Sequence, residues 1–234
     1  MSSLKKKLTK RDIEIVKFVF ENKFLLRSQI ERLFFSQNKQ SRVICNRRLR
    51  KLEKLQLIKR FKLSLNEEAV ISPGFFLSTL DKNNYYYRLP NNYLHYILRN
   101  EVYVLLKETP YLTIDTFLVE YVFKQNNYTL QADILTIVKY KNKVFSLIIE
   151  VDTGTESLKI LKEKLNVYNH LKKHFSNFPE LIIFTTDMNI KRLLRIEETL
   201  YVGIFQQTNN FQELIQLPTL KTINFFEKTL YWNI

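Results

Sequence analysis

The first 35 residues combine apolar positions at helical spacing with short polar connectors. Thr9 and Asp12, three residues apart, are typical of a capping box at the start of a helix. The apolar positions at helical spacing in the following segment, "KRDIEIVKFVF", are Ile13, Val16, Val19 and Phe20. A second segment, "LLRSQIERLFF", has Ser28 at a candidate cap, and its inward positions are Ile30, Leu33 and Phe34. The pattern predicts two short helices.

A third helix is predicted in "SRVICNRRLRKLEKLQLI", residues 41–58. Cys45, Leu49 and Leu52 form an apolar stripe with the i, i+4, i+7 spacing of one helical face. A strand, "LIKRFKLSL", follows at residues 57–65, and residues 74–90, "GFFLSTLDKNNYYYRLP", are predicted to pair with it. Three short helices followed by a β-hairpin make up the plan of a winged helix-turn-helix. We assign it to residues 1–90.

From residue 91 the pattern changes to that of an α/β domain. The stretch 91–109 has helical periodicity, and three β-rich runs with polar turns follow it. Next come a helical stretch at 155–175, a buried strand in "ELIIFTTD", a helix and a last strand at 201–205. The fold class is therefore α+β overall, with an αβββαβ series in a second domain at residues 91–234. No element is assigned within residues 206–234.

Charge is distributed unevenly along the 234 residues. The net charge is +14, and all of this excess lies in residues 1–64, while residues 65–234 carry equal numbers of acidic and basic side chains. Such asymmetry indicates nucleic acid or another anionic partner for the N-terminal segment. One cysteine, Cys45, excludes a disulfide framework and a cysteine-based zinc site. Neither a signal peptide nor an apolar run of about 18 residues is present, so we expect a soluble cytoplasmic protein without a membrane partner.

The basic residues of the third helix and of the following strand suit double-stranded DNA. In a winged helix-turn-helix the third helix enters the major groove, and side chains near its start read base edges. Arginine pairs with guanine and asparagine with adenine. The residues predicted to read bases are Ser41, Arg42, Asn46 and Arg47. Those predicted to bind phosphates are Arg50, Lys51, Lys54, Lys59, Arg60 and Lys62. The alternative is a solvated basic helix without a ligand.

Two carboxylates end the apolar strand in "SLIIEVDTGTES". Glu150 and Asp152 are two residues apart, so they project from the same face of a strand. Asp133 starts the apolar half of the preceding strand, and a short hairpin would bring it beside them. Three such carboxylates form a candidate site for Mg²⁺ or Mn²⁺, and Lys164 on the next helix could position water or stabilise charge. The simpler alternative is a set of solvated strand-end acids.

The αβββαβ series with these acids resembles the PD-(D/E)XK nuclease superfamily. The resemblance implies that Asp133 is the Asp of its motif and that Glu150 is the acid of its E-x-K half. Asp152 stands where that motif has its lysine, and Lys164 is the candidate replacement from the helix. Glu101, on the helix before the sheet, is a further candidate ligand by the same resemblance, although its position favours the surface.

A second resemblance extends over most of the chain. "LTKRDIEIVKFV" and "NRRLRKLEKLQLIKR", followed by "EVDTGTES" and "KLNVY", are similar to the replication-relaxation family of bacterial plasmids and other mobile elements. The resemblance implies DNA binding at an origin, in replication initiation or relaxation of plasmid DNA, with nicking as an associated activity. His95, His170 and His174 form no pattern typical of metal ligands, which disfavours a relaxase with a histidine triad.

Two hypotheses follow from the sequence. In the first, the chain binds mobile-element DNA and cleaves it with Mg²⁺; Asp133 and Glu150 are metal ligands, Asp152 is a ligand or base, and Lys164 positions water. In the second, the chain is a non-catalytic DNA-binding regulator whose C-terminal domain serves dimerisation or partner binding. A homodimer is compatible with both hypotheses.

Overall fold

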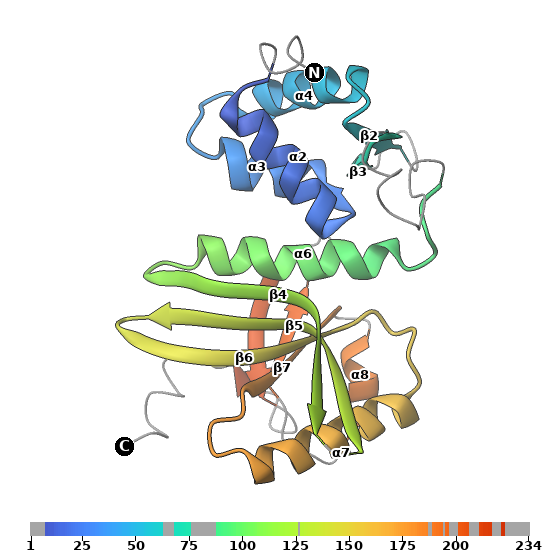
Figure 1. Cartoon of the computed structure of the whole chain (residues 1–234), viewed down its shortest axis with the longest axis vertical. Helices are drawn as coiled ribbons and strands as arrows, with labels where there is room; N and C mark the ends of the chain where they lie inside the picture. The colour runs from blue at the N-terminus through green and yellow to red at the C-terminus, as the bar shows by residue number, and fades with distance from the viewer. Residues whose placement is uncertain are drawn as a thin grey trace. The chain divides into compact units, whose positions relative to one another are not determined.

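The computed structural model describes residues 8–62, 68–75, 88–125, 127–186, 189–193, 195–196, 201–205, 211–216 and 221–222. The chain divides into two compact units, Met1–Asn100 and Glu101–Ile234 (Figure 1). Helix α6, Tyr93–Glu108, contributes its first half to the N-terminal unit and its second half to the C-terminal unit. Within the described ranges, no helix is both long and apolar enough to span a membrane.

The N-terminal unit contains three helices and a small antiparallel sheet. Its elements are α2 (Lys10–Asn22), β1 (Leu25–Leu26), α3 (Arg27–Phe35), α4 (Ser41–Lys54), β2 (Ile58–Phe61) and β3 (Val70–Pro73). The strands are ordered β1-β3-β2, and both pairs are antiparallel. The predicted succession of three helices followed by a hairpin is therefore present in the structure.

Local sequence signals explain where α2 begins but not which face it buries. The Thr9 hydroxyl accepts a hydrogen bond from the Asp12 amide at 3.3 Å, and the Asp12 carboxylate accepts one from the Thr9 amide at 2.9 Å. The predicted capping box is thus confirmed. The core-facing apolar residues are Ile15 and Val19, whereas Ile13 is 55% exposed. The helix is rotated from the predicted face because buried Asp12 and Asn22 occupy its inner side as well.

The next two helices differ in how well the sequence anticipates them. Helix α3 begins after Leu26, whose amide donates to the Gln29 side chain, so Ser28 does not cap it. Ser28 instead donates through its amide and hydroxyl to Glu68. In α4 the predicted stripe is confirmed, since the residues of α4 that lie buried in the core are Cys45, Leu49 and Leu52.

The hairpin pairs different residues from those predicted. Strand β2 pairs antiparallel with β3, and Arg60 lies opposite Ile71. The prediction that residues 74–90 supply the partner strand is therefore wrong for β2; residues 76–87 of that stretch lie outside the described residues. The "AVISP" stretch was missed because four apolar or small residues before a proline are too short a pattern to distinguish a buried strand from a loop. All four residues of β3 are buried.

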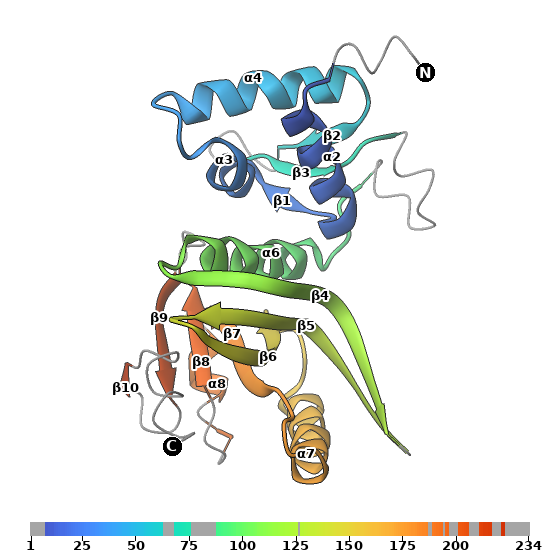
Figure 2. The ribbon, with the colours of Figure 1, turned by 60° about the vertical axis from the view of Figure 1, so that its left-hand side comes forward.

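The C-terminal unit is built on a seven-stranded sheet ordered β10-β9-β8-β7-β6-β5-β4 (Figure 2). Its strands are β4 (Leu112–Gln125), β5 (Tyr128–Tyr140), β6 (Lys143–Asp152), β7 (Glu180–Thr186), β8 (Tyr201–Phe205), β9 (Phe211–Gln216) and β10 (Lys221–Thr222). Its further helices are α7 (Leu158–His174) and α8 (Ile190–Leu193). The order α6-β4-β5-β6-α7-β7 confirms the predicted αβββαβ series, and the chain is an α+β protein.

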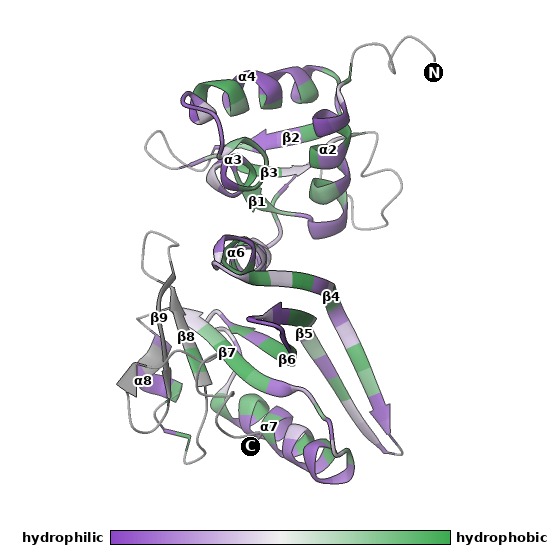
Figure 3. Ribbon diagram, turned by 90° about the vertical axis from the view of Figure 1, so that its left-hand side faces the viewer, coloured by the Kyte–Doolittle hydropathy of each residue, from purple (hydrophilic) through white to green (hydrophobic). Residues whose placement is uncertain are grey.

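Strands β6, β7 and β8 run parallel, while the hairpin strands β4 and β5 run antiparallel to their neighbours. Strand β7 is buried over five successive residues and is largely apolar along its ribbon (Figure 3). Helix α7 covers this region with one apolar face. Its buried residues are Leu161, Leu165, Tyr168 and Leu171. The Tyr168 hydroxyl donates to the Pro179 carbonyl and accepts from the Leu181 amide, which ties α7 to the start of β7.

Candidate functional site

Asp133 and Glu150 lie on neighbouring strands at the point where the β5–β6 ladder ends. The last paired residues are Ile134 and Ile149, one position before the two acids. Beyond that pair, the Val151 amide donates to Asp133 Oδ2 at 2.7 Å. A side-chain carboxylate therefore replaces a backbone carbonyl at the next step of the ladder. This arrangement brings the Asp133 carboxylate close to Glu150, as the hairpin geometry predicts.

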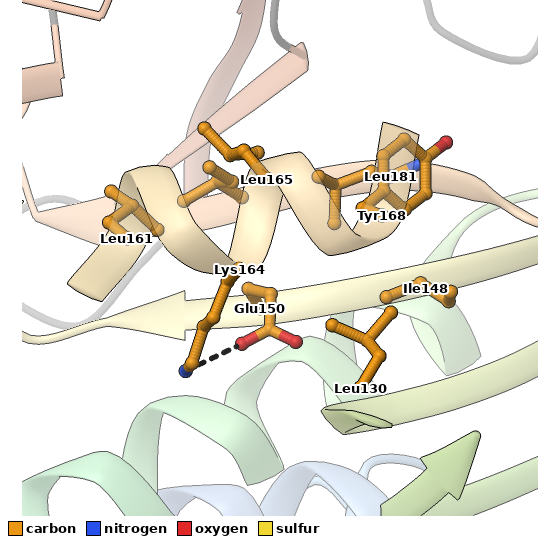
Figure 4. A pocket seen from close by; sticks show the side chains of 9 residues that line it. Leu130, Ile148, Glu150, Leu161, Lys164, Leu165, Tyr168 and Leu181 are labelled. Atoms are coloured by element: carbon orange, nitrogen blue, oxygen red, sulfur yellow. Dashed lines mark hydrogen bonds and ion pairs between the residues drawn. The ribbon is translucent and has the colours of Figure 1, made fainter. Parts of the chain in front are cut away.

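Glu150 is a buried acid with one satisfied and one unsatisfied oxygen. It is 5% exposed, and its Oε2 lies 3.3 Å from Lys164 Nζ, as the dashed line in Figure 4 marks. Its Oε1 is buried and has no hydrogen-bond partner in the part of the chain that the structure describes. Burial and the neighbouring charge of Asp133 raise the pKa of Glu150 to about 8, although Lys164 opposes the shift.

Apolar side chains from four elements surround this carboxylate. They come from β5, β6, α7 and β7, and they are Leu130, Ile148, Leu161, Leu165, Tyr168, Leu181 and Ile183 (Figure 4). These groups cannot solvate a carboxylate, so Glu150 gains little from the charged form unless a cation is close. The surroundings explain why burial is the largest cause of its raised pKa.

Lys164, on α7, places a cation beside Glu150. Its Nζ lies 2.9 Å from Glu156 Oε1 and 3.3 Å from Glu150 Oε2, so the ammonium bridges the two acids. Burial acts to lower the pKa of Lys164, but the charges of Glu150 and Glu156 outweigh it and raise the pKa above its usual value. The amine is therefore protonated at neutral pH. This suits Lys164 for stabilising negative charge and excludes it as a general base in this state.

Asp152 does not join these acids. Its carboxylate accepts from Arg192, with Nη2 at 2.7 Å from Oδ1 and Nε at 3.2 Å from Oδ2. It also accepts from the Gly154 amide at 3.0 Å. The predicted ligand or base is thus occupied by an arginine from α8. Among the described residues, no three His, Cys, Asp or Glu side chains form a group that could hold a metal ion. The expectation of three converging carboxylates is therefore corrected to two.

Two carboxylates still suit the ion that the sequence implies. Mg²⁺ is commonly bound by one or two protein carboxylates and keeps several water molecules. Asp133 and Glu150 are hard oxygen donors on adjacent strands, and Glu150 Oε1 has no partner among the described groups. The donor chemistry therefore fits Mg²⁺ or Mn²⁺. Glu101 was expected at the surface, but this residue of α6 is 1% exposed and therefore buried.

The predicted DNA-binding residues lie mostly on the outer face of α4. Exposed among them are Arg42, Arg47, Arg50, Lys54 and Lys62, while Asn46, Lys51 and Lys59 are partly exposed. Ser41 and Arg60 have internal partners instead. The Ser41 hydroxyl donates to Glu31 at 2.5 Å, and Arg60 Nε donates to Glu53 at 2.6 Å. These two side chains stabilise the start of α4 and the α4–β2 connection in this structure.

Two arginines with clear roles escaped the sequence reasoning. Arg48 Nη2 lies 2.7 Å from Oδ2 of Asp12, which is fully buried, and it also donates to Thr9. Arg192 holds Asp152 from 40 residues away. No local pattern marks either pair, because both form only when distant helices or strands meet. The single usable signal was the acidic cap residue Asp12, whose inward position requires a positive partner.

The chain matches no family model and no curated protein. The resemblance to the replication-relaxation family therefore stays a prediction. Two solved structures are similar at low level. An XisH family protein from Nostoc punctiforme aligns with a TM-score of 0.36 and 11% identity, over 50% of this chain and 98% of that one. Can2 from Sulfobacillus thermosulfidooxidans, solved in complex with cyclic tetra-adenylate, aligns with a TM-score of 0.30 and 12% identity, over 69% of this chain and 41% of that one.

Proposed function

We propose that the C-terminal unit is a Mg²⁺-dependent phosphodiesterase that acts on DNA bound by the N-terminal unit. The observation that carries the proposal is the buried Oε1 of Glu150, which has no hydrogen-bond partner among the described residues and lies beside a second carboxylate and a protonated lysine. A buried carboxylate oxygen without a partner is costly to maintain in a purely structural role. A bound cation would remove that cost, so the pattern is typical of a site built for a ligand.

Asp133 and Glu150 would hold the ion, which would supply Lewis-acid activation of water and of the phosphate when bound. The chain's own residues have separate tasks. The Lys164 ammonium stabilises the negative charge that develops on the phosphate oxygens. Hydrolysis forms a bond from the water oxygen to phosphorus and breaks the bond from phosphorus to a sugar oxygen, which takes up a proton. The surrounding apolar residues exclude bulk water from the Glu150 carboxylate.

The N-terminal unit would deliver the substrate. Three helices followed by a hairpin follow the winged helix-turn-helix plan, in which α4 is the reading helix. Support comes from the exposed cations of α4 and from the location of the whole +14 charge in residues 1–64. Neutralising DNA phosphates with such cations releases counterions, which makes binding strong at low salt. By its sequence resemblance, the target would be plasmid or mobile-element DNA during replication initiation or relaxation.

Cleavage of supercoiled plasmid tests the proposal. Plasmid DNA is incubated with wild-type protein and Mg²⁺ or Mn²⁺, alongside Asp133→Ala, Glu150→Ala and Lys164→Ala. We expect wild type to convert supercoiled plasmid to open-circular or linear DNA and the three variants to lose at least about 10²-fold in rate. Lys162→Ala is the matched control, because Lys162 is exposed on the same helix. Plasmid that stays supercoiled while it shifts in a gel would contradict the nuclease proposal.

A second candidate is a non-catalytic DNA-binding regulator. One observation favours it: Lys164 already bridges Glu150 and Glu156, and Arg192 already neutralises Asp152, so most charges here are internally balanced. In that case the C-terminal unit would serve dimerisation or partner binding. The plasmid assay separates the two candidates, since a regulator shifts the DNA and leaves its topology unchanged with every metal ion.

A further inference from the structure

We propose that Arg192 is a positioning residue that clamps the loop 153–157 and thereby holds Lys164 next to Glu150. The inference rests on the proposed function for its catalytic meaning, but its structural part can be tested without any cleavage. Arg192 belongs to the short helix α8 and does not contact Glu150 in any hydrogen bond or ion pair found among the described residues. Its influence on the site would pass through the loop.

The guanidinium of Arg192 contacts both ends of this loop. Its Nη2 and Nε donate to the two carboxylate oxygens of Asp152 at the end of β6. Its Nη1 donates to the Gly154 carbonyl at 3.1 Å and to the Glu156 carbonyl. A planar fork that satisfies one carboxylate and two carbonyls fixes the path of the backbone more tightly than a single contact does. The side chain is 19% exposed, so water competes little.

The loop backbone gives a second reason for the clamp. Gly154 has a φ of +82°, a conformation that glycine adopts without the cost that other residues incur. A Cβ at this position would meet Asn189 atoms at 2.5 to 2.9 Å, so the loop lies directly against Asn189, the residue before α8. The Gly154 amide also donates to Asp152. Asp152 and Arg192 therefore determine the conformation of the turn between β6 and α7.

Glu156 connects this turn to the carboxylate pair. Its carbonyl is held by Arg192, and its carboxylate accepts from Lys164 Nζ at 2.9 Å. Lys164 is in turn 3.3 Å from Glu150. A lysine side chain has four rotatable bonds, and simultaneous contacts with two acids restrict its rotamers. If the loop is released, Glu156 no longer stays in reach and Lys164 samples other rotamers. Asp152 stands where the PD-(D/E)XK motif has its lysine, and its role in this proposal is to hold Arg192.

The test is an NMR measurement on the full chain. The Lys164 ammonium, identified by its loss in Lys164→Arg, is observed through its ¹⁵Nζ signal. Hydrogen-bonded, partly buried ammonium groups exchange their protons slowly, so we expect this signal in wild type. We expect it to be lost by exchange in Arg192→Gln and in Asp152→Asn. Arg195→Gln is the matched control, because Arg195 is exposed nearby and its removal costs the same charge. That variant should keep the signal.

Further measurements separate positioning from simple loss of structure. The core methyl signals of Leu165 should be unchanged in Arg192→Gln; if this variant unfolds, Asp152→Asn provides the test. Adding Arg192→Gln to Glu156→Ala should not change the Lys164 signal further, because Glu156→Ala already removes the carboxylate that links the loop to Lys164. In the plasmid assay, Arg192→Gln should lower the maximal rate by about 10²-fold without changing the DNA concentration for half-maximal rate.

A Lys164 signal that survives in both Arg192→Gln and Asp152→Asn would overturn the inference. The two levels of the proposal fail separately. If the wild-type protein leaves plasmid uncut and the Lys164 signal is lost in the Arg192→Gln variant, the nuclease function is refuted and the clamp is supported. If the wild-type protein cuts plasmid and the Arg192→Gln variant keeps both the Lys164 signal and the cleavage rate, the clamp is refuted and the nuclease function is supported.

Discussion

Glu150 and Asp152 lie two residues apart on β6, and their carboxylates meet very different surroundings. Asp152 has a bidentate arginine and a backbone amide. Glu150 has one lysine contact, an oxygen without a partner among the described groups, and a pKa raised to about 8 by burial and by Asp133. A buried carboxyl group whose two oxygens both have partners stabilises the fold, whereas one with an oxygen that lacks a partner marks a candidate ligand site.

The same contrast separates two neighbouring arginines in the N-terminal unit. Arg48 forms hydrogen bonds with both oxygens of buried Asp12, while Arg47, at the preceding position of α4, is exposed. We therefore infer a structural role for Arg48 and propose a DNA-binding role for Arg47.

Removing Arg48, which is paired with buried Asp12, should have the largest effect on stability. Arg48→Ala leaves the fully buried Asp12 carboxylate without its cation, which typically costs about 3 kcal/mol. Arg47→Ala should change the free energy of unfolding by no more than about 0.5 kcal/mol, since the Arg47 side chain is exposed. Urea titration followed by circular dichroism measures both. Equal destabilisation by the two variants would show that the contrast between the arginines does not hold.

Removing the exposed arginines should instead weaken DNA binding. Arg47→Ala combined with Arg50→Ala should lower the slope of log affinity against log salt by about 0.9 for each DNA phosphate that is no longer neutralised. Fluorescence anisotropy with a labelled duplex at several salt concentrations measures the slope. Lys17→Ala is the control, because Lys17 is an exposed cation of the same unit on α2 rather than α4. An unchanged slope in the double variant would remove α4 from the proposed DNA interface.

A smaller effect concerns the pH dependence of stability. The pKa of Glu150 in the folded protein, about 8, lies above its ordinary value of 4.5. The folded state therefore binds a proton more tightly than the unfolded state does, so the contribution of Glu150 to stability is complete below about pH 4.5 and is lost as pH rises through about 8. Glu150→Gln should raise the melting temperature at pH 8 by a few degrees, about 2–4 °C per kcal/mol, and much less at pH 5. Equal shifts at both pH values would contradict the raised pKa.

Features that depend on nearby residues could be predicted from the sequence. The capping box of Thr9 and Asp12, the buried stripe of α4 and the αβββαβ order all follow from spacing within one element or its neighbours. The approach of Lys164 to Glu150 was also predicted, since a helix that follows a strand packs back on it. These features can be predicted without knowledge of the tertiary fold, because the spacing of nearby residues determines them.

Features that depend on distant partners could not be predicted. Asp152 and Arg192 meet only because parallel β7 lies beside β6 and places the following helix over the end of that strand. The burial of Glu101 and the pairing of β3 with β2 depend in the same way on tertiary contacts. The sequence next to each of these residues either predicts nothing about its burial or predicts that it is exposed. Burial of a polar residue becomes favourable only when its distant partner is in place.

Binding of Mn²⁺ to the full chain, followed by electron paramagnetic resonance, tests whether Asp133 and Glu150 form a metal centre. Free Mn²⁺ loses its signal when it binds, so the number of sites can be counted with no DNA present. We expect one site in wild type, its loss in Asp133→Asn and Glu150→Gln, and its retention in Glu163→Gln, which alters an exposed acid of α7. Retention of the site in Glu150→Gln would contradict the assignment of this carboxylate pair as the metal centre.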